Sequence, residues 1–197
     1  MVEPAPARGN AEMNSVSLRA GQYGFTLVEV LVTLLVLAIG LLGLAGMNAR
    51  MLNSQFEAYQ RAQAMMLVED MASRIRSNPQ AARNGDYDTD TVHGLNNQNC
   101  SGAYGVSIDL CEWNQALRGA SVEASGQQLG SIMGARGCID NVSIAATGQA
   151  VIRVTVAWQG LTPTVIPPLS CGANAYGADD RLRRAVSVDV VLAYLGV

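Results

Sequence analysis

The longest apolar stretch of this chain runs from Phe25 to Met47, 23 residues that contain a single charge, Glu29. As an α-helix this stretch is about 35 Å long, enough to cross a hydrocarbon core of about 30 Å. A secretory signal peptide has a shorter apolar region followed by a small-residue cleavage site. Here the run is longer, and the small residue, Gly24, precedes it. The pattern predicts a membrane-spanning helix.

The helical pattern continues beyond the apolar stretch. Residues 48–78 contain no glycine or proline, and the pair Asn78-Pro79 supplies a stop signal. Inside the span, three glycines each cost about 1 kcal/mol relative to alanine; these are Gly40, Gly43 and Gly46. They fit either a helix contact face of small residues or a segment that unwinds and stretches.

Two apolar stripes follow the span on different sides of the helix. The first contains Leu52, Phe56, Tyr59 and Met66, and the second contains Ala64, Leu67, Met71 and Ile75. We interpret the first stripe as a surface for other subunits and the second as the face that packs on this chain's own sheet. The alternative is a single core face that drifts around the helix.

Strand patterns dominate the end of the chain, at residues 139–145, 151–158 and 185–195, with a turn at 147–149 and a long loop at 162–178. Burial on both sides of the second strand is expected. Together with the helix they predict an α+β fold, an antiparallel sheet laid against one long helix. Residues 80–137 are expected to be an irregular connection with a short helix within 115–128. Its segment 84–90 has the alternating aspartates of a calcium loop but lacks the required glycine and glutamate, so a solvated loop is predicted.

Composition and charge argue against several function classes. The formal net charge is −3, all 13 basic residues are scattered arginines, and no basic stripe with aromatics supports nucleic-acid binding. The single histidine, His93, lies in a Gly/Asn-rich segment and is expected to be exposed to solvent. With no nucleophile–base set and no metal-ligand spacing, the sequence predicts neither an enzyme nor a cofactor.

The segment Gly24-Phe25-Thr26-Leu27-Val28-Glu29, followed by the apolar run, resembles the prepilin signature of type IV pilins and pseudopilins. The resemblance implies cleavage between Gly24 and Phe25 by a prepilin peptidase, N-methylation of Phe25, and a subunit-docking role for Glu29. Residues 47–79 extend it toward the minor pilins called PilV, the type IV pilus modification proteins. The close resemblance covers about 55 of 197 residues.

The charge of Glu29 has a physical reading that fits this resemblance. A charged side chain at the centre of a span costs about 2.5–3.5 kcal/mol and less toward its end, so it requires a partner. The amine released at Phe25 is largely cationic at neutral pH and lies about one helical turn away. Pairing between subunits offsets part of the cost and favours docking at a defined axial offset. The alternative is an ordinary anchor with Glu29 among the headgroups.

The resemblance implies a pilin-like domain plan: leader 1–24, span 25–47, periplasmic helix 48–79 and periplasmic domain 80–197, with Met13 as an alternative start. It also implies a single-pass inner-membrane location before the pilus, with the tip as the expected position. The implied partners are other minor and major pilins, the prepilin peptidase and the inner-membrane assembly platform, with a tip adhesin left open. Two alternatives are a minor pseudopilin of type II secretion and a single-span periplasmic sensor or receptor anchor.

Four cysteines lie in the domain that this plan places in the oxidising periplasm, namely Cys100, Cys111, Cys138 and Cys171. Three pairings are possible. Sequential pairing is the simplest, because it closes one short loop and ties the proline-rich loop back to the first predicted strand. No CxxC spacing is present, which argues against zinc ligation or redox catalysis.

Overall fold

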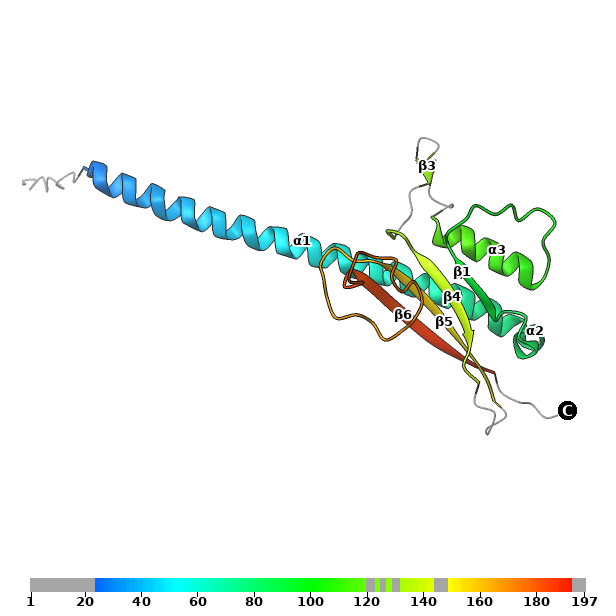
Figure 1. The fold of residues 1–197 in the computed structure, drawn as a ribbon. Coiled ribbons are helices and arrows are strands. Elements are labelled where there is room, and N and C mark those ends of the chain that lie inside the picture. The colour runs from blue at the N-terminus through cyan, green and yellow to red at the C-terminus, as the bar shows by residue number, and fades with distance from the viewer. Residues whose placement is uncertain (1–23, 120–122, 125–126, 129–131, 144–148, 193–197) are drawn as a thin grey trace, which may run out of the picture. The chain divides into compact units, whose positions relative to one another are not determined.

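The computed structural model describes residues 24–119, 123–124, 127–128, 132–143 and 149–192. They form an α+β protein, which confirms the predicted class (Figure 1). The elements are α1 (Leu27–Ser77), α2 (Pro79–Asn84), β1 (Thr89–His93), α3 (Val106–Leu117), β2 (Glu123–Ala124), β3 (Gln127–Gln128), β4 (Arg136–Asn141), β5 (Ala150–Gln159) and β6 (Arg183–Leu192). The chain divides into two compact units, Met1–Gly46 and Met47–Val197, which we describe separately.

The described part of the first unit is the start of α1. The helix begins at Leu27 and is continuous through Gly40, Gly43 and Gly46. An 18-residue window of α1 has a mean hydropathy of 2.7, and none of that window is buried. By length and composition this helix can cross a membrane, which fits the predicted anchor.

The second unit contains a four-stranded antiparallel sheet in the order β1-β4-β5-β6 (Figure 1). Strands β5 and β6 pair along their whole length, from Ala150 opposite Leu192 to Gln159 opposite Arg183. The three strands predicted from the sequence correspond to β4, β5 and β6, although β4 and β6 begin two to three residues earlier than predicted. Residues 144–145 and 193–195 of the first and third predicted strands, and Thr147 and Gly148 of the predicted turn, lie outside the described residues.

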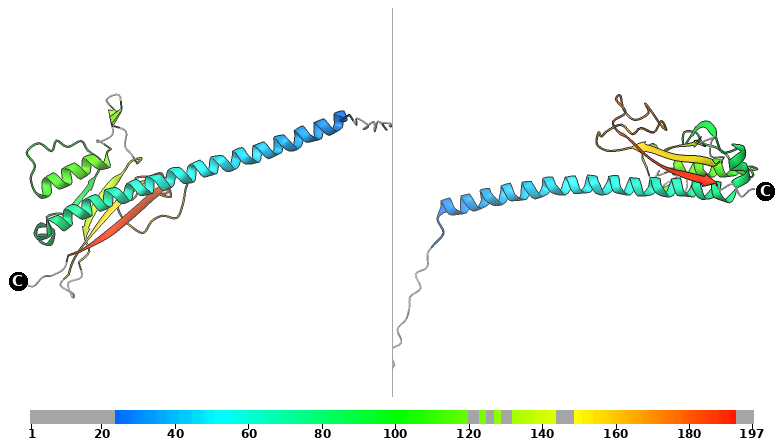
Figure 2. Two further views of the ribbon diagram at one scale, coloured as in Figure 1. Left: turned by 180° about the vertical axis from the view of Figure 1, so that it is seen from behind. Right: turned by 90° about the horizontal axis from the view of Figure 1, so that it is seen from below.

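In the second unit, α1 packs against one face of the sheet (Figure 2). The second predicted stripe is confirmed as the inward face: Ala64, Met71 and Ile75 are fully buried, and Leu67 is packed against the same core. Strand β5 supplies the opposing side chains Ile152, Val154 and Val156. Because α1 and β5 meet through aliphatic side chains along several turns, this contact forms the main hydrophobic core.

The first predicted stripe is on the outside of the second unit. Leu52, Phe56, Tyr59 and Met66 expose between 42% and 60% of their surface. A single core face that drifts around the helix would have buried these residues, so that alternative is wrong. The helix presents two apolar surfaces, and only one of them is used by the domain itself.

The other face of β5 is covered by residues 160–182, which we call the proline loop. Ala157 of β5 forms a small second core with Cys171 and Tyr176 of this loop, and the Tyr176 hydroxyl donates to the Gly134 carbonyl at 2.7 Å. From Val154 to Trp158, strand β5 is therefore buried on both faces, as expected, whereas Arg153 is partly exposed and Gln159 is exposed. The small and β-branched residues Val154 to Ala157 suit this part of the strand, which has no solvent-facing side.

The structure contains two disulfides, Cys100–Cys111 and Cys138–Cys171, which is the sequential pairing. The first joins the segment before α3 to the helix itself. The second joins β4 to the proline loop across 33 residues of sequence. Each disulfide therefore holds a segment that has little regular structure against an element that is well packed.

The expectation for residues 80–137 is wrong in part. The segment contains β1 and α3, and the short helix predicted within 115–128 instead spans Val106–Leu117. Helix α3 turns a stripe at helical spacing toward the core, made of Val106, Leu110, Trp113 and Leu117. The solvated loop predicted at 84–90 is correct only in part: Asn84 ends α2, Thr89 begins β1, and Tyr87 between them is fully buried.

The expectation that His93 is solvent-exposed is also wrong. His93 ends β1, is buried, and lies 5.5 Å from the Trp113 ring between centroids. Its Nε2 is 3.1 Å from the Thr89 hydroxyl, whereas Nδ1 is buried without a hydrogen-bond partner. Burial therefore lowers the pKa of His93 below its ordinary value.

This burial makes the fold sensitive to mild acid. Because the pKa of His93 is lower in the folded state, the unfolded chain takes up the proton first as the pH falls below about 6.5. Stability should be complete above that pH and fall below it. Thermal unfolding followed between pH 7 and pH 5 should show a smaller acid loss in His93→Gln than in wild type. Equal losses would contradict this account.

Candidate functional site

The start of α1 presents the residues of the predicted processing site. Gly24 and Phe25 precede the helix and are exposed. A Cβ added at Gly24 would meet no atom within 4 Å. The chain's own packing therefore does not require glycine here, so any such requirement lies with an enzyme that binds this segment.

Glu29 has a second, local relation to the helix start. The Thr26 hydroxyl accepts a hydrogen bond from the Glu29 backbone N–H at 3.3 Å, and the Val30 N–H donates to the Thr26 carbonyl. Thr26 is thus the N-cap, and Thr-x-x-Glu is the capping-box sequence pattern. The sequence interpretation did not use this pattern, although Thr26 and Glu29 stand at this spacing at the start of the apolar run.

The Glu29 carboxylate is exposed and takes part in no ion pair among the described residues. The nearby Thr33 hydroxyl, by contrast, donates to the Val30 carbonyl within the same helix at 2.8 Å. In an apolar environment the hydroxyl is satisfied locally and the carboxylate is not. Glu29 is therefore the group in this part of α1 that calls for an external partner.

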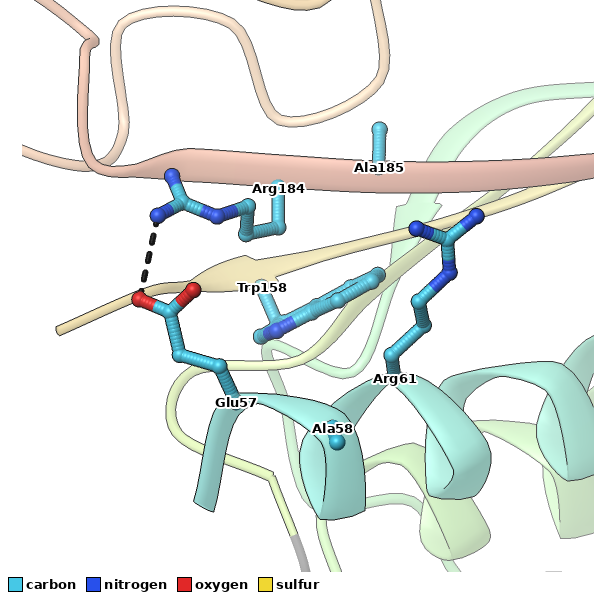
Figure 3. A pocket seen from close by; sticks show the side chains of 6 residues that line it. All are labelled: Glu57, Ala58, Arg61, Trp158, Arg184 and Ala185. Carbon is cyan, nitrogen blue, oxygen red and sulfur yellow. Dashed lines mark hydrogen bonds and ion pairs between the residues drawn. The ribbon is translucent and has the colours of Figure 1, made fainter. Parts of the chain in front are cut away.

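A second arrangement of polar groups lies in the second unit, where α1 meets the start of β6 and the proline loop (Figure 3). Glu57 Oε1 accepts four hydrogen bonds: from Arg184 Nη2 at 3.1 Å, from the Thr162 hydroxyl at 3.0 Å, and from the backbone N–H groups of Leu161 and Thr162. Burial by itself raises the pKa of Glu57, but Thr162 and Arg184 outweigh it and hold the pKa below its ordinary value.

An open pocket of about 350 Å³ lies beside this contact, lined by Glu57, Ala58, Arg61, Trp158, Arg184 and Ala185 (Figure 3). The Glu57 carboxylate in this pocket already accepts four hydrogen bonds, so we interpret it as the group that holds residues 160–182 on α1. The sequence carries no signal for the contact, since the residues it joins are 104 to 127 positions apart.

A comparable network joins the end of α1 to α3. Arg74 Nη1 donates to Glu112 Oε2 at 2.7 Å and to Asp109 Oδ1 at 3.3 Å, and its Nε pairs with Asp70. The Tyr87 hydroxyl donates to Asp109 Oδ2 at 2.5 Å. Burial and the Asp109 carboxylate raise the pKa of Tyr87 to about 12, so it stays protonated as a donor. Nothing in the sequence indicated this network either. Its role is structural, because it holds α3 against the end of α1.

Comparison with known proteins identifies the N-terminal segment. Residues 19–45 match the family model described as the prokaryotic N-terminal methylation motif, and this range includes Gly24, Phe25 and Glu29. Comparison with curated proteins and with solved structures found no significant match. The chain therefore carries a type IV prepilin-like N-terminus, which points to the pilin-like and pseudopilin class and implies interaction with a prepilin peptidase and an assembly machinery.

Proposed function

We propose that this chain is a minor pilin of a type IV pilus, a non-enzymatic subunit that enters the filament through its N-terminal helix. The observation that carries the proposal is the methylation motif at the start of a helix that continues for 51 residues into an α+β domain. The resemblance of residues 47–79 to PilV proteins supports the minor-subunit role.

The N-terminal chemistry supports assembly by lateral docking. After cleavage the new amine of Phe25 carries a positive charge at neutral pH. The Glu29 carboxylate of a neighbouring subunit is the group that satisfies it in an apolar medium, where both charges are costly alone. Pairing occurs only at one axial offset between two helices, so it selects a register as well as a partner.

The exposed stripe of α1 supplies a second contact surface. Leu52, Phe56, Tyr59 and Met66 remain accessible although the domain has packed its own core. Aromatic and methionine side chains are common in the buried centres of protein interfaces. This stripe packs against the helices of other minor and major pilins once the subunit leaves the bilayer.

The proposed role is to help prime pilus assembly on the inner-membrane platform and to present a tip adhesin. A pseudopilin of type II secretion shares the methylation motif and is the second candidate. Deletion of the chain separates the two: a pilin loss reduces the number of surface pili and leaves secretion intact, whereas a pseudopilin loss does the reverse.

Processing provides the direct test of the prepilin assignment. We expect the mature chain to begin at Phe25 with one added methyl group on nitrogen. Gly24→Ala should block most of this cleavage, because a methyl group enters a peptidase site that accepts none, while the chain's own fold is unaffected. Intact-mass analysis of the membrane-extracted protein measures both.

Gly40→Ala is the matched control, because a Cβ there also meets nothing within 4 Å; it should be cleaved normally. A mature N-terminus upstream of Gly24 would defeat the prepilin assignment. It would favour the single-span sensor or receptor anchor, which keeps its N-terminal segment.

A further inference from the structure

The proline loop, residues 160–182, is held rigidly although it contains no helix or strand. Arg183 at the start of β6 is buried and pairs with Asp180 at 2.6 Å. Its guanidinium donates to three loop carbonyls, those of Pro167, Leu169 and Cys171. One buried guanidinium thus fixes the backbone of residues 167–171, which we call the second arm of the loop.

Residues 161–164, which we call the first arm of the loop, are held by a different arginine. Arg184 donates to the Thr162 carbonyl at 2.7 Å and to the Thr164 hydroxyl at 2.7 Å, while Glu57 holds the backbone of Leu161 and Thr162. The Thr164 N–H also donates to the Arg181 carbonyl. The backbone dihedral angles are further restricted by Pro163, Pro167 and Pro168. The loop is therefore pre-organised from both arms.

The first arm and the residues that follow it expose aliphatic side chains. Val165 is 89% exposed and Ile166 is 48% exposed, and Leu161 within the first arm is 40% exposed. We call these three residues the apolar tip. A flexible loop could fold such side chains back onto the domain, but this one is fixed with them outward. A rigid, outward apolar tip indicates a binding surface.

The place of the loop along α1 indicates what the tip meets. Thr162 lines a pocket with Glu57, Ser54, Asn53 and Arg50 of α1. Arg50 is three residues after Met47, the end of the apolar run, which is about 5 Å of helix rise. In a chain anchored by that run, this level of the helix is at the headgroups. An arginine there suits anionic lipid phosphates.

We propose that, in the membrane-anchored chain before assembly, the apolar tip inserts into the headgroup–acyl boundary of the bilayer. The tip has aliphatic residues but no aromatic or arginine anchor of the kind that dominates protein interfaces, which favours lipid over a protein groove. Because the chain is already tethered, a contact too weak to bind a free protein is enough to orient the domain. The inference depends on membrane anchoring alone and not on the pilus assignment.

Tryptophan quenching by brominated lipids tests the contact. Full-length Val165→Trp is reconstituted without other pilins into phosphatidylethanolamine–phosphatidylglycerol vesicles with brominated acyl chains. Tyr104→Trp is the matched control, an 81% exposed position before α3, and the two native tryptophans are buried in the domain. We expect bromination to quench the added tryptophan of Val165→Trp at least about twofold more than that of Tyr104→Trp.

Equal quenching in the two variants would overturn the proposal. Protection of Val165→Trp that appears only when other pilins are added would also overturn it and would assign the tip to a protein partner. Since position 165 is almost fully exposed, the substitution should not disturb folding. Non-reducing peptide mapping of both disulfides verifies this. Cleavage after Gly24 is measured separately by intact mass, so equal quenching in the two variants would not count against the proposed function.

Discussion

Glu29→Val is expected to leave the chain inserted and cleaved but to weaken its docking on other pilins at least about a hundredfold. Removing one partner of a poorly solvated ion pair costs about 3–5 kcal/mol, because the other charge is left without compensation. A loss of about 2.7 kcal/mol already corresponds to a hundredfold. The span itself becomes more apolar, so membrane levels should be normal or higher.

The structure separates this effect from damage to the helix start. The hydrogen bond at the N-cap joins the Thr26 hydroxyl to the backbone N–H of residue 29, which valine retains. Fraying of α1 should therefore be small. Glu29→Gln tests charge against shape: if docking needs the ion pair, glutamine should behave like valine despite its similar size.

Co-purification of other pilins from solubilised membranes, together with counts of surface pili, measures the docking. We expect weaker co-purification and fewer or shorter pili, with normal cleavage and intact disulfides. If Glu29→Val assembled as well as wild type, the carboxylate would have no docking role in this subunit. That result would fit a subunit confined to the tip, with no neighbour above it.

Trp113→Ala is expected to destabilise the second unit by about 3–5 kcal/mol, a large share of the 5–15 kcal/mol typical of a whole domain. Trp113 is fully buried and packs against His93. Its Nε1 donates to the Leu67 carbonyl of α1 at 2.8 Å. The indole joins α3, β1 and α1, so its removal leaves a cavity where three elements meet.

Thermal unfolding of the full chain in detergent, with both disulfides intact, measures this loss. Trp113→Phe keeps most of the ring packing and should lose about 1 kcal/mol with the hydrogen bond. Gly137 offers a second control, because a Cβ there would overlap the indole ring of Trp113 and lie 2.6 Å from a terminal methyl carbon of Leu117. Gly137→Ala should destabilise wild type and cost less in Trp113→Ala, where the vacated space relieves the overlap with the ring and lets the Leu117 side chain shift. Additive losses would show that the two residues do not share this space.

Several features of the protein could be predicted from local sequence alone. The unbroken apolar run from Phe25 to Met47, the stop at Asn78-Pro79 and the inward stripe through Met71 and Ile75 all correspond to α1. The β-branched runs similarly identified β4, β5 and β6. Hydrophobic periodicity encodes these elements directly, because helix and strand turn apolar side chains to one side at different spacings. The prepilin signature at Gly24 and Phe25 is equally local.

Other features were decided by packing between distant segments. Helix α3 has a clear stripe from Val106 to Leu117, but its neighbouring glycines and polar residues concealed it, and the fold supplies the core that stabilises it. His93 was expected to be exposed because its sequence neighbours are polar. The structure buries it because β1 pairs with β4 and places it beside Trp113.

The polar contacts that hold the proline loop are the clearest example of a feature that local sequence does not predict. Glu57 and Arg184 are 127 residues apart, and the spacing of charges along the chain gives no sign that they meet. The same holds for the rigid outward position of Val165, which depends on two arginines of β6 and a carboxylate of α1. Local sequence determined the anchor, helix α1 and strands β4, β5 and β6, because each depends on the pattern of neighbouring residues. Only the tertiary structure decided which charges pair and which apolar side chains remain outside, because those choices depend on chain segments brought together by folding.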